Sequence, residues 1–533
     1  MTTGVRSVAA LVAVALLHAS LGFESVWPTL GVRPVARVSL EAAALVLLLA
    51  VGRGWWAWSP SSRARRWLAI AWVALVAGHY VTITTQALYG RSVNLYWDLK
   101  LVPDVGAMFA AVANPLVLAA FVAGLILVPL GLYLPARWAI GAVAEACAVP
   151  RLRAALAGLS AVVVAAGVAS RVAPATVSPA LIAPPISVGI AAEAWQFARE
   201  ATGVGRQPLP PPQDLTNDLS RIRGADVLLF FVESYGVTSW ERPEFRSALA
   251  PARATLTDAL QGTGRSVVTA RVESTTFGGE SWLAHISLLS GVEVRDADVN
   301  RRLMAERRDT LVTTFTRAGY RAVAFMPGLQ APWPEGGFYG FDRIFGAKDV
   351  DYTGPPFGWW DVTDQFVVSR MDEQMIAPTG RPPSFVVFPT ISTHAPFMPV
   401  PPYQPDWDRL LQLSPYDADA LARAYEDVPD WTDLGPGYAK AVGYWHDVLS
   451  GYLRRRADRD LVVIMLGDHQ PPALVTGEGA SWDVPVHVIA SRPDVLDRLR
   501  AAGFTDGLEP PDAALTRIDL LLPVLLDAFG ESE

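Results

Sequence analysis

Two apolar runs in the second half of the chain constrain its fold more than any other feature. Residues 228–232 read Leu-Leu-Phe-Phe-Val and lead into Glu233, and residues 462–467 read Val-Val-Ile-Met-Leu-Gly and lead into Asp468 and His469. Runs that are apolar on both faces are typical of parallel strands covered by helices, and such sheets bind ligands at the carboxyl ends of their strands. We therefore expect these three polar side chains to meet at one sheet edge, as a metal site of hard oxygens and one nitrogen.

The first third of the chain is predicted to lie in a membrane. Of the 533 residues, 51% are hydrophobic, and the mean hydropathy of +0.27 is too high for a purely soluble protein. Five stretches carry few or no charges and approach or exceed the roughly 20 residues that a helix needs to cross a bilayer. The first can be an uncleaved anchor or a cleaved signal peptide, and the spans that follow it favour the anchor. The five stretches are residues 7–23, 38–58, 67–90, 105–136 and 154–170.

Arginines predict which side of the membrane each loop faces. The loops after the second and fourth stretches are rich in arginine, and the positive-inside rule places such loops in the cytoplasm. The N-terminus is then cytoplasmic, and everything after residue 171 lies outside, in the periplasm of a bacterial-type inner membrane. The arginines of these two loops are Arg63, Arg65 and Arg66, and Arg137, Arg151 and Arg153.

Composition divides the chain into three parts. A five-helix membrane domain is expected over residues 1–171, a proline-rich linker over 172–220 and a catalytic domain over 221–533. Within the linker, residues 186–202 have the pattern of an amphipathic helix that either lies on the membrane surface or packs in the ordinary way. In the fourth span, Asn114-Pro115 is expected to separate a short interfacial helix from the span proper.

Charge and cysteine content argue against nucleic-acid binding and against intramolecular disulfides. The net charge is −8 and no basic block is present, so nucleic acid is not expected as a partner. The single cysteine, Cys147, excludes intramolecular disulfides, so an exported domain must be held together by its core alone.

From residue 221 onward the pattern alternates between strands and helices. This alternation predicts an α/β domain with a mostly parallel sheet. Strands are expected at residues 227–232, 267–272, 322–325, 385–388, 461–466 and 484–489. Helices are expected at residues 251–261, 281–290, 308–318, 438–456, 493–502 and 516–529.

A serine at the start of one of these helices is the candidate nucleophile. The loop after the strand at 267–272 contains Gly278-Gly279 and runs into a short apolar helix from Ser281 that stops at Gly291. A hydroxyl at a helix N-terminus lies in a positive field beside free backbone N–H groups, which suits a phosphate. A divalent metal on that oxygen makes it an alkoxide near neutral pH. The competing interpretation is a simple helix N-cap, which is what serine most often provides at this position.

Two histidines are further candidates. His394 lies in the loop after the strand at 385–388, at the same predicted edge as the metal site. His285 follows Ser281 by one helical turn on the same face, where it can shuttle a proton or serve as a buried, hydrogen-bonded histidine.

Four motifs in order together resemble the alkaline phosphatase/sulfatase superfamily, and within it the lipoteichoic acid synthase type. They are Val-Glu-Ser at 232–234, a Gly-Gly-x-Ser helix start whose helix ends in Leu-Leu-Ser-Gly, Thr-His-x-Pro-Phe at 393–397 and Gly-Asp-His at 467–469. The resemblance covers about residues 226–489. It implies an alkaline phosphatase-like fold for this part, and five spans ahead of an outer domain also fit that type.

The resemblance assigns roles to individual residues. It implies that one divalent cation (Mn, Mg or Zn) is bound by Glu233, Ser281, Asp468 and His469, and that His394 contacts the transferred phosphate. Members of the family take a phospho-headgroup from a phospholipid, hold it covalently on Thr or Ser, and pass it to a hydroxyl acceptor.

The chain also departs from that pattern. The usual nucleophile is Thr, so Thr275 or Thr276 is an alternative to Ser281. Glycerol-phosphate transferases bind the headgroup with a Trp followed two residues later by Arg, whereas here Trp333 is followed by Glu335. An acidic side chain there suits an aminated headgroup. No Cys-x-Pro-x-Arg motif is present, which argues against a formylglycine sulfatase.

The expected activity is metal-dependent transfer of phosphoglycerol or phosphoethanolamine from a phospholipid donor to an envelope glycan or glycolipid. The alternative is a membrane-anchored hydrolase, a phosphodiesterase or sulfatase that uses the same metal. Several predicted spans favour the transferase, because a hydrolase of soluble esters needs only one anchor. A catalytically inactive scaffold is disfavoured by the intact set of metal ligands.

Overall fold

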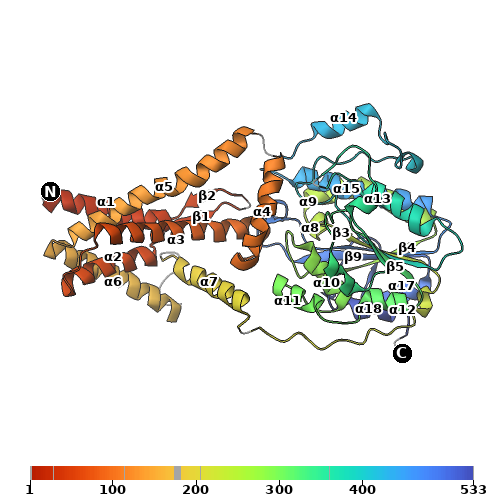
Figure 1. The fold of residues 1–533 in the computed structure, drawn as a ribbon, viewed down its shortest axis with the longest axis horizontal. Helices are drawn as coiled ribbons and strands as arrows, with labels where there is room; N and C mark the ends of the chain where they lie inside the picture. Colours follow the sequence, from red (N-terminus) through yellow and green to blue (C-terminus); the bar gives the residue numbers. More distant parts are fainter. Residues whose placement is uncertain are drawn as a thin grey trace. The chain divides into compact units, whose positions relative to one another are not determined.

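The computed structural model describes residues 3–27, 29–112, 115–172, 182–204, 206–358 and 360–531. The chain forms two compact units. The first consists of Met1–Ala87 and Arg91–Arg206, and the second of Leu88–Gly90 and Gln207–Glu533. Helices dominate the first unit and a helix-covered sheet forms the second (Figure 1).

The first unit contains the predicted membrane helices. Four of its helices are long and apolar enough to cross a membrane, over Thr3–Leu21, Ser62–Tyr89, Leu118–Ala146 and Pro150–Ser170. The second predicted span forms a helix of only 16 residues, so five spans are not confirmed. The elements are α1 (Thr3–Leu21), β1 (Phe23–Ser25), β2 (Val32–Pro34), α2 (Leu40–Trp55), α3 (Ser62–Tyr89), α4 (Leu95–Val112), α5 (Pro115–Ala146), α6 (Pro150–Val172) and α7 (Ile186–Thr202).

The fourth predicted span is built from two helices. Helix α4 ends at Val112 and α5 begins at Pro115, while Asn114 itself lies outside the described residues. Helix α5 then continues ten residues beyond the predicted end at residue 136. Arg137 is therefore helical, where the sequence predicted a loop. The core of this unit is rich in alanines, such as Ala13 and Ala139, whose small side chains allow close helix packing.

The second unit is built on a nine-stranded sheet with the order β10-β4-β9-β8-β3-β7-β5-β6, and β11 pairs with β4. All six predicted strands are present, but the sheet is mixed, so the mostly parallel sheet is not confirmed. Strand β9 runs antiparallel to both β8 and β4, and β10 is antiparallel to β4. The strands are β3 (Asp226–Val232), β4 (Ser266–Glu273), β5 (Arg321–Phe325), β6 (Arg343–Phe345), β7 (Ser384–Pro389), β8 (Leu461–Gly467), β9 (Asp483–Ala490), β10 (Thr505–Asp506) and β11 (Thr516–Arg517).

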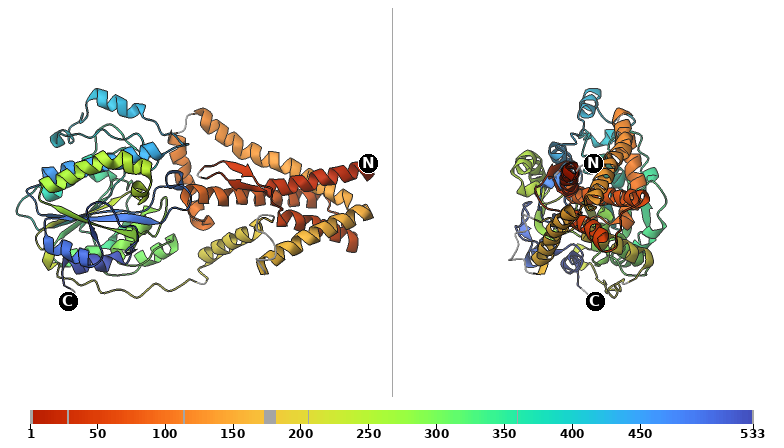
Figure 2. Two further views of the ribbon diagram at one scale, coloured as in Figure 1. Left: turned by 180° about the vertical axis from the view of Figure 1, so that it is seen from behind. Right: turned by 90° about the vertical axis from the view of Figure 1, so that its left-hand side faces the viewer.

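Helices cover both faces of this sheet, as Figures 1 and 2 show. Every residue of β3 and β8 is buried, and alternate side chains of β3 enter different cores. Helices α9, α13 and α15 pack on one face, and α10, α12, α17 and α18 pack on the other. The helices are α8 (Thr238–Glu241), α9 (Pro243–Gly262), α10 (Ser281–Ser290), α11 (Ala297–Met304), α12 (Leu311–Arg317), α13 (Asp364–Met371), α14 (Ala418–Glu426), α15 (Gly435–Arg455), α16 (Ala473–Thr476), α17 (Pro493–Ala501) and α18 (Leu521–Phe529).

Two helices of this unit begin five or more residues away from their expected starts. Helix α9 begins at Pro243, ahead of the predicted start at residue 251. Helix α18 begins at Leu521 and not at residue 516, because Thr516–Arg517 instead pairs with β4 as strand β11. The second compact unit includes the chain from Gln207 onward, and the predicted catalytic-domain boundary at residue 221 stays a prediction.

Candidate active site and metal centre

The ends of two neighbouring strands bring the first site residues together. Strands β3 and β8 are parallel and in register, with Val232 paired to Gly467. The next residues along the chain, Glu233 and Asp468, therefore emerge side by side at the carboxyl edge of the sheet. Gly467 is required for this arrangement, because a Cβ atom there would overlap the carbonyl oxygen of Tyr235.

Glu233, Asp468 and His469 form one buried cluster, as the sequence predicted. Each offers a ligand atom, and these atoms lie within 4.8 Å of one another. Nε2 of His469 is 3.2 Å from Oε1 of Glu233. Nδ1 of His469 is 2.7 Å from the carbonyl oxygen of Gln470, so we assign the proton to Nδ1 in the neutral ring and the lone pair to Nε2. That lone pair faces the carboxylates.

The hydroxyl of Ser281 reaches this cluster. Its Oγ donates a hydrogen bond of 2.6 Å to Oε2 of Glu233 and lies 3.1 Å from Nε2 of His469. Ser281 is the first residue of α10, and the N-cap position belongs to Glu280. The serine side chain therefore points to the cluster instead of capping its own helix.

The backbone before α10 is unusual. Gly278, Gly279 and Glu280 all have positive φ, at 67°, 150° and 59°. Glycine adopts such angles without cost, but for Glu280 they are unfavourable. This turn places the N-terminus of α10, the positive end of the helix, beside Ser281.

The two threonines that were alternatives to Ser281 have other partners. Oγ1 of Thr275 is 3.3 Å from Oγ of Ser287, and Oγ1 of Thr276 donates to the carbonyl oxygen of Gly279 at 2.6 Å. Of the three hydroxyls, Ser281 alone contacts the cluster in the part of the chain that the structure describes.

The electrostatics of the cluster are those of a cation site. Burial raises the pKa of Glu233, but the charge and hydrogen bond of His469 outweigh it and hold this pKa below its ordinary value. Burial and the charge of Glu233 both raise the pKa of Asp468. Burial lowers the pKa of His469, and the two carboxylates overcome this and raise it to about 9. Without a cation, the imidazole therefore carries a proton between the carboxylates.

Two buried atoms beside the cluster lack hydrogen-bond partners among the described residues. They are Oδ2 of Asp468 and Nε2 of His285, which lie 3.6 Å apart. Oδ1 of Asp468 is satisfied, since it accepts from the backbone N–H groups of Ser234 and His469 at 2.9 and 2.7 Å. A carboxylate oxygen without a donor, beside a second carboxylate and an imidazole, fits a divalent cation.

His285 matches neither expected role fully. It is buried against Phe231, with ring centroids 4.3 Å apart, and its Nε2 faces Asp468 without forming a hydrogen bond.

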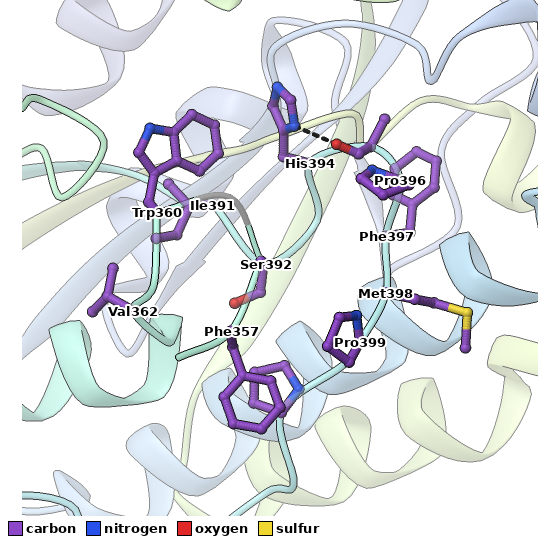
Figure 3. Close-up of a pocket in the computed structure, with 13 residues that line it drawn as sticks. Phe357, Trp360, Val362, Ile391, Ser392, His394, Pro396, Phe397, Met398 and Pro399 are labelled. Atoms are coloured by element: carbon purple, nitrogen blue, oxygen red, sulfur yellow. Dashed lines mark hydrogen bonds between the residues drawn. The ribbon is translucent and has the colours of Figure 1, made fainter. Parts of the chain in front are cut away.

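The loop that carries His394 is tied to the cluster. Oγ1 of Thr390 accepts a hydrogen bond of 3.0 Å from the backbone N–H of Glu233. The carboxylate of Asp364 accepts from the next two backbone N–H groups of the loop, at 2.8 and 3.0 Å. The His394 ring meets Trp360 edge-on, with centroids 4.7 Å apart, and its Nδ1 donates to the carbonyl oxygen of Ala395 (Figure 3).

Asp364, Thr390 and Trp360 are site residues that the sequence analysis missed. None of them belongs to one of the four motifs, and none directly follows the end of a predicted strand. Their role is visible only once the loop after β7 is folded against α13 and the cluster.

Trp333 is not brought into the cluster. It precedes a short 3₁₀ helix, Pro334–Tyr339, and packs on Tyr339 with ring centroids 5.7 Å apart. Glu335 is exposed beside it. In the described part of the chain, Trp333 has no hydrogen bond or ring contact with the cluster.

Comparison with known proteins gives one family match, over part of the chain. Residues 233–485 match the model of the sulfatase family. The match begins at Glu233 and spans Ser281, His394, Asp468 and His469. No sequence among curated proteins matches this chain significantly.

Solved structures give remote similarities. The integral membrane lipooligosaccharide phosphoethanolamine transferase A of Neisseria meningitidis is 12% identical over 98% of this chain and 95% of its own, with a TM-score of 0.47. The lipoteichoic acid synthase of Listeria monocytogenes is 13% identical over 63% and 81%, with a TM-score of 0.38. A phosphonate monoester hydrolase of Silicibacter pomeroyi is 13% identical over 58% and 74%, with a TM-score of 0.34. These scores lie below 0.5 and carry no functional argument.

Proposed function

We propose that this chain, which carries a sulfatase-family domain over residues 233–485, transfers a phospho-headgroup from a membrane phospholipid to a hydroxyl of an envelope glycan or glycolipid. The observation that carries the proposal is the Ser281 hydroxyl, held 2.6 Å from Glu233 inside a cluster suited to a cation and at a helix N-terminus. A serine so placed is an activated nucleophile for a phosphate ester. Helices able to cross a membrane in the same chain favour a lipid donor.

In the first step, Oγ of Ser281 attacks the phosphorus of the donor lipid, and the bond between phosphorus and the diacylglycerol oxygen breaks. The serine proton leaves to solvent, while Oε2 of Glu233, its hydrogen-bond partner, orients the hydroxyl. The departing diacylglycerol oxygen takes a proton from solvent. The headgroup phosphate is then a diester of Ser281, close to the free N–H groups of α10 and to His394.

In the second step, an acceptor hydroxyl attacks the same phosphorus, and the bond to Ser281 breaks. The serine oxygen takes a proton from solvent, and the acceptor hydroxyl releases one to solvent. A divalent cation held by Glu233, Asp468 and His469 would supply positive charge beside the serine oxygen and the phosphate, and would lower the pKa of the hydroxyl.

Headgroup selection is proposed to involve Trp333 and Glu335. An exposed carboxylate beside an aromatic ring favours a cationic amine over a neutral glycerol. Phosphatidylethanolamine should then be used in preference to phosphatidylglycerol. Glu335→Gln should reduce that preference without lowering turnover of phosphatidylglycerol.

The test is turnover of labelled phosphatidylglycerol and phosphatidylethanolamine by the purified full chain, scored as release of diacylglycerol. Ser281→Ala should keep most of its metal and lose turnover by orders of magnitude, whereas Ser281→Thr should retain some activity. Thr276→Ala is the matched control, because its hydroxyl donates within the same loop but does not reach the cluster.

Intact-protein mass spectrometry should reveal the covalent intermediate. Enzyme trapped with donor lipid should gain the mass of one phospho-headgroup, mapping to the peptide of residues 271–291. The mass also distinguishes glycerol from ethanolamine. An adduct on Thr275 or Thr276 would move the nucleophile but leave the mechanism intact. Full activity in the alanine variants of all three residues would end the covalent mechanism.

The second candidate is a hydrolase, favoured by the sulfatase-family match itself. In that case water replaces the acceptor in the second step. Free headgroup phosphate would then appear at the same rate with and without a glycan or glycolipid acceptor. A formylglycine sulfatase is disfavoured, because the sequence has no Cys-x-Pro-x-Arg motif and the single cysteine, Cys147, is buried just after α5.

A further inference from the structure

A cavity of about 470 Å³ lies at one end of the helices of the first unit. It is lined by Arg6 of α1, Arg65 of α3 and Arg137 of α5, together with Trp138 and Glu145. Each arginine comes from a different helix, so their convergence is a product of the fold and not of a basic stretch of sequence. The volume falls in the range of ligand pockets, roughly 300–1,000 Å³.

In the part of the chain that the structure describes, the three guanidinium groups have no carboxylate partner. Among the described residues, no carboxylate oxygen lies within 4.0 Å of any of them. Nε of Arg6 is buried without a hydrogen-bond partner among the described residues, and Arg137 makes a long contact of 3.5 Å with the hydroxyl of Tyr133. Arg65 lies against Gly141, where a Cβ atom would come within 3.3 Å of its NH1. Unpaired guanidinium groups around a cavity attract an anion.

The position of the cavity relates it to the membrane. Helices α1 and α3 begin beside it and α5 ends beside it, and each contains a candidate span. The three helix ends therefore share one side of the membrane. The loop pattern of arginines, to which Arg65 and Arg137 contribute, predicts that this side is the cytoplasm. The N-termini of α1 and α3 add positive potential.

We propose that this cavity binds the phosphate of an anionic phospholipid from the inner leaflet, with phosphatidylglycerol as the representative ligand. Three arginines and Glu145 leave an excess of positive charge, which favours a headgroup with net negative charge over a zwitterionic one. The carboxylate of Glu145 can accept a hydrogen bond from a glycerol hydroxyl. Leu134, which also lines the cavity and is 57% exposed, offers an apolar surface to the acyl chains. This site is separate from the catalytic cluster and does not depend on the proposed reaction.

The experiment is native mass spectrometry of the full chain in detergent, titrated with phosphatidylglycerol, phosphatidylcholine or inorganic phosphate. Phosphatidylglycerol should occupy this cavity as one molecule per chain, in addition to any donor lipid at the catalytic cluster, and phosphatidylcholine should bind it at least tenfold more weakly. The variant R6Q/R65Q/R137Q should lose roughly 100-fold in phosphatidylglycerol affinity, since each basic side chain near a bilayer strengthens the attraction about fivefold.

The matched control is R63Q/R66Q, which removes two exposed arginines from the same turn of α3 that do not line the cavity. It should bind phosphatidylglycerol like the parent protein. R6K/R65K/R137K keeps the charge and should retain most of the affinity, which separates loss of binding from loss of folding. Equal losses in the glutamine triple variant and the control would overturn the proposal. So would equal binding of phosphatidylcholine, or inorganic phosphate that binds as tightly as the lipid, which would leave a small-anion site only.

Discussion

Cation binding to the cluster should release a proton, and its affinity should depend on pH in a defined way. A metal needs the lone pair on Nε2 of His469, but the two carboxylates raise the pKa of this imidazole to about 9. Below pH 9 the ring is protonated in the metal-free protein, so the cation must displace that proton. The affinity should therefore fall about tenfold for each pH unit below 9, and by about 100-fold between pH 9 and pH 7.

That difference corresponds to about 2.7 kcal/mol of binding free energy. The assay is calorimetric titration of chelator-stripped protein with Mn²⁺ or Zn²⁺ at pH 7, in buffers of different ionisation enthalpy. About one proton should be released per cation. His394→Ala, which leaves the three ligands intact, should release the same number, whereas His469→Gln should bind weakly and release none.

Release of fewer than about 0.3 protons by the unmodified protein would refute this reasoning. An affinity that does not change between pH 7 and pH 9 would refute it equally. Either result would mean that His469 is neutral in the metal-free cluster, or that it is not a ligand.

Three further predictions concern stability. Gly467→Ala should destabilise the catalytic domain by at least about 3 kcal/mol in denaturant unfolding, because its Cβ meets a backbone carbonyl, whereas Gly443→Ala has room and should not. Burial lowers the pKa of His446 to about 4, below the 6.5 of an exposed ring, so its contribution to stability is lost as the pH falls from 6.5 towards 4. His446→Phe should remove up to about 3 kcal/mol of this acid sensitivity, and an unchanged pH profile would contradict it. A fragment of residues 207–533 should fold as a soluble domain with one cooperative melt, and 221–533 should melt lower, because it lacks the leucines at 215 and 219 that are buried in the core.

Strand positions in the catalytic domain were predictable from the sequence, but strand direction was not. Runs such as Leu461–Gly467 are apolar throughout because both faces are buried, and that pattern is the same for a parallel or an antiparallel neighbour. The sequence therefore predicted β9 as a strand but not its antiparallel direction. The short strand at Thr516–Arg517 was mistaken for the start of a helix, since two residues show no periodicity.

The buried cluster of Glu233, Asp468 and His469 was predictable, because these residues directly follow two apolar strands whose carboxyl ends were expected at one sheet edge. Locating the ends of these two strands in the sequence was enough to find Glu233, Asp468 and His469. The support for the His394 loop was not predictable. Asp364 holds that loop by accepting hydrogen bonds from its backbone N–H groups. Nearly every residue type has a backbone N–H, so such contacts cannot be recognised from the sequence.

The pairing of Val232 with Gly467 has a consequence for how the enzyme matures. These partners are 235 positions apart in the chain, so the ligand cluster does not exist until β8 has joined β3. Non-local pairings of this kind form late in folding. If the catalytic domain is exported as proposed, nearly all of it must be translocated before a cation site exists. The protein would then be loaded with metal outside the cytoplasm, from the ions available there, and cytoplasmic metal levels would have no direct influence on which ion it carries.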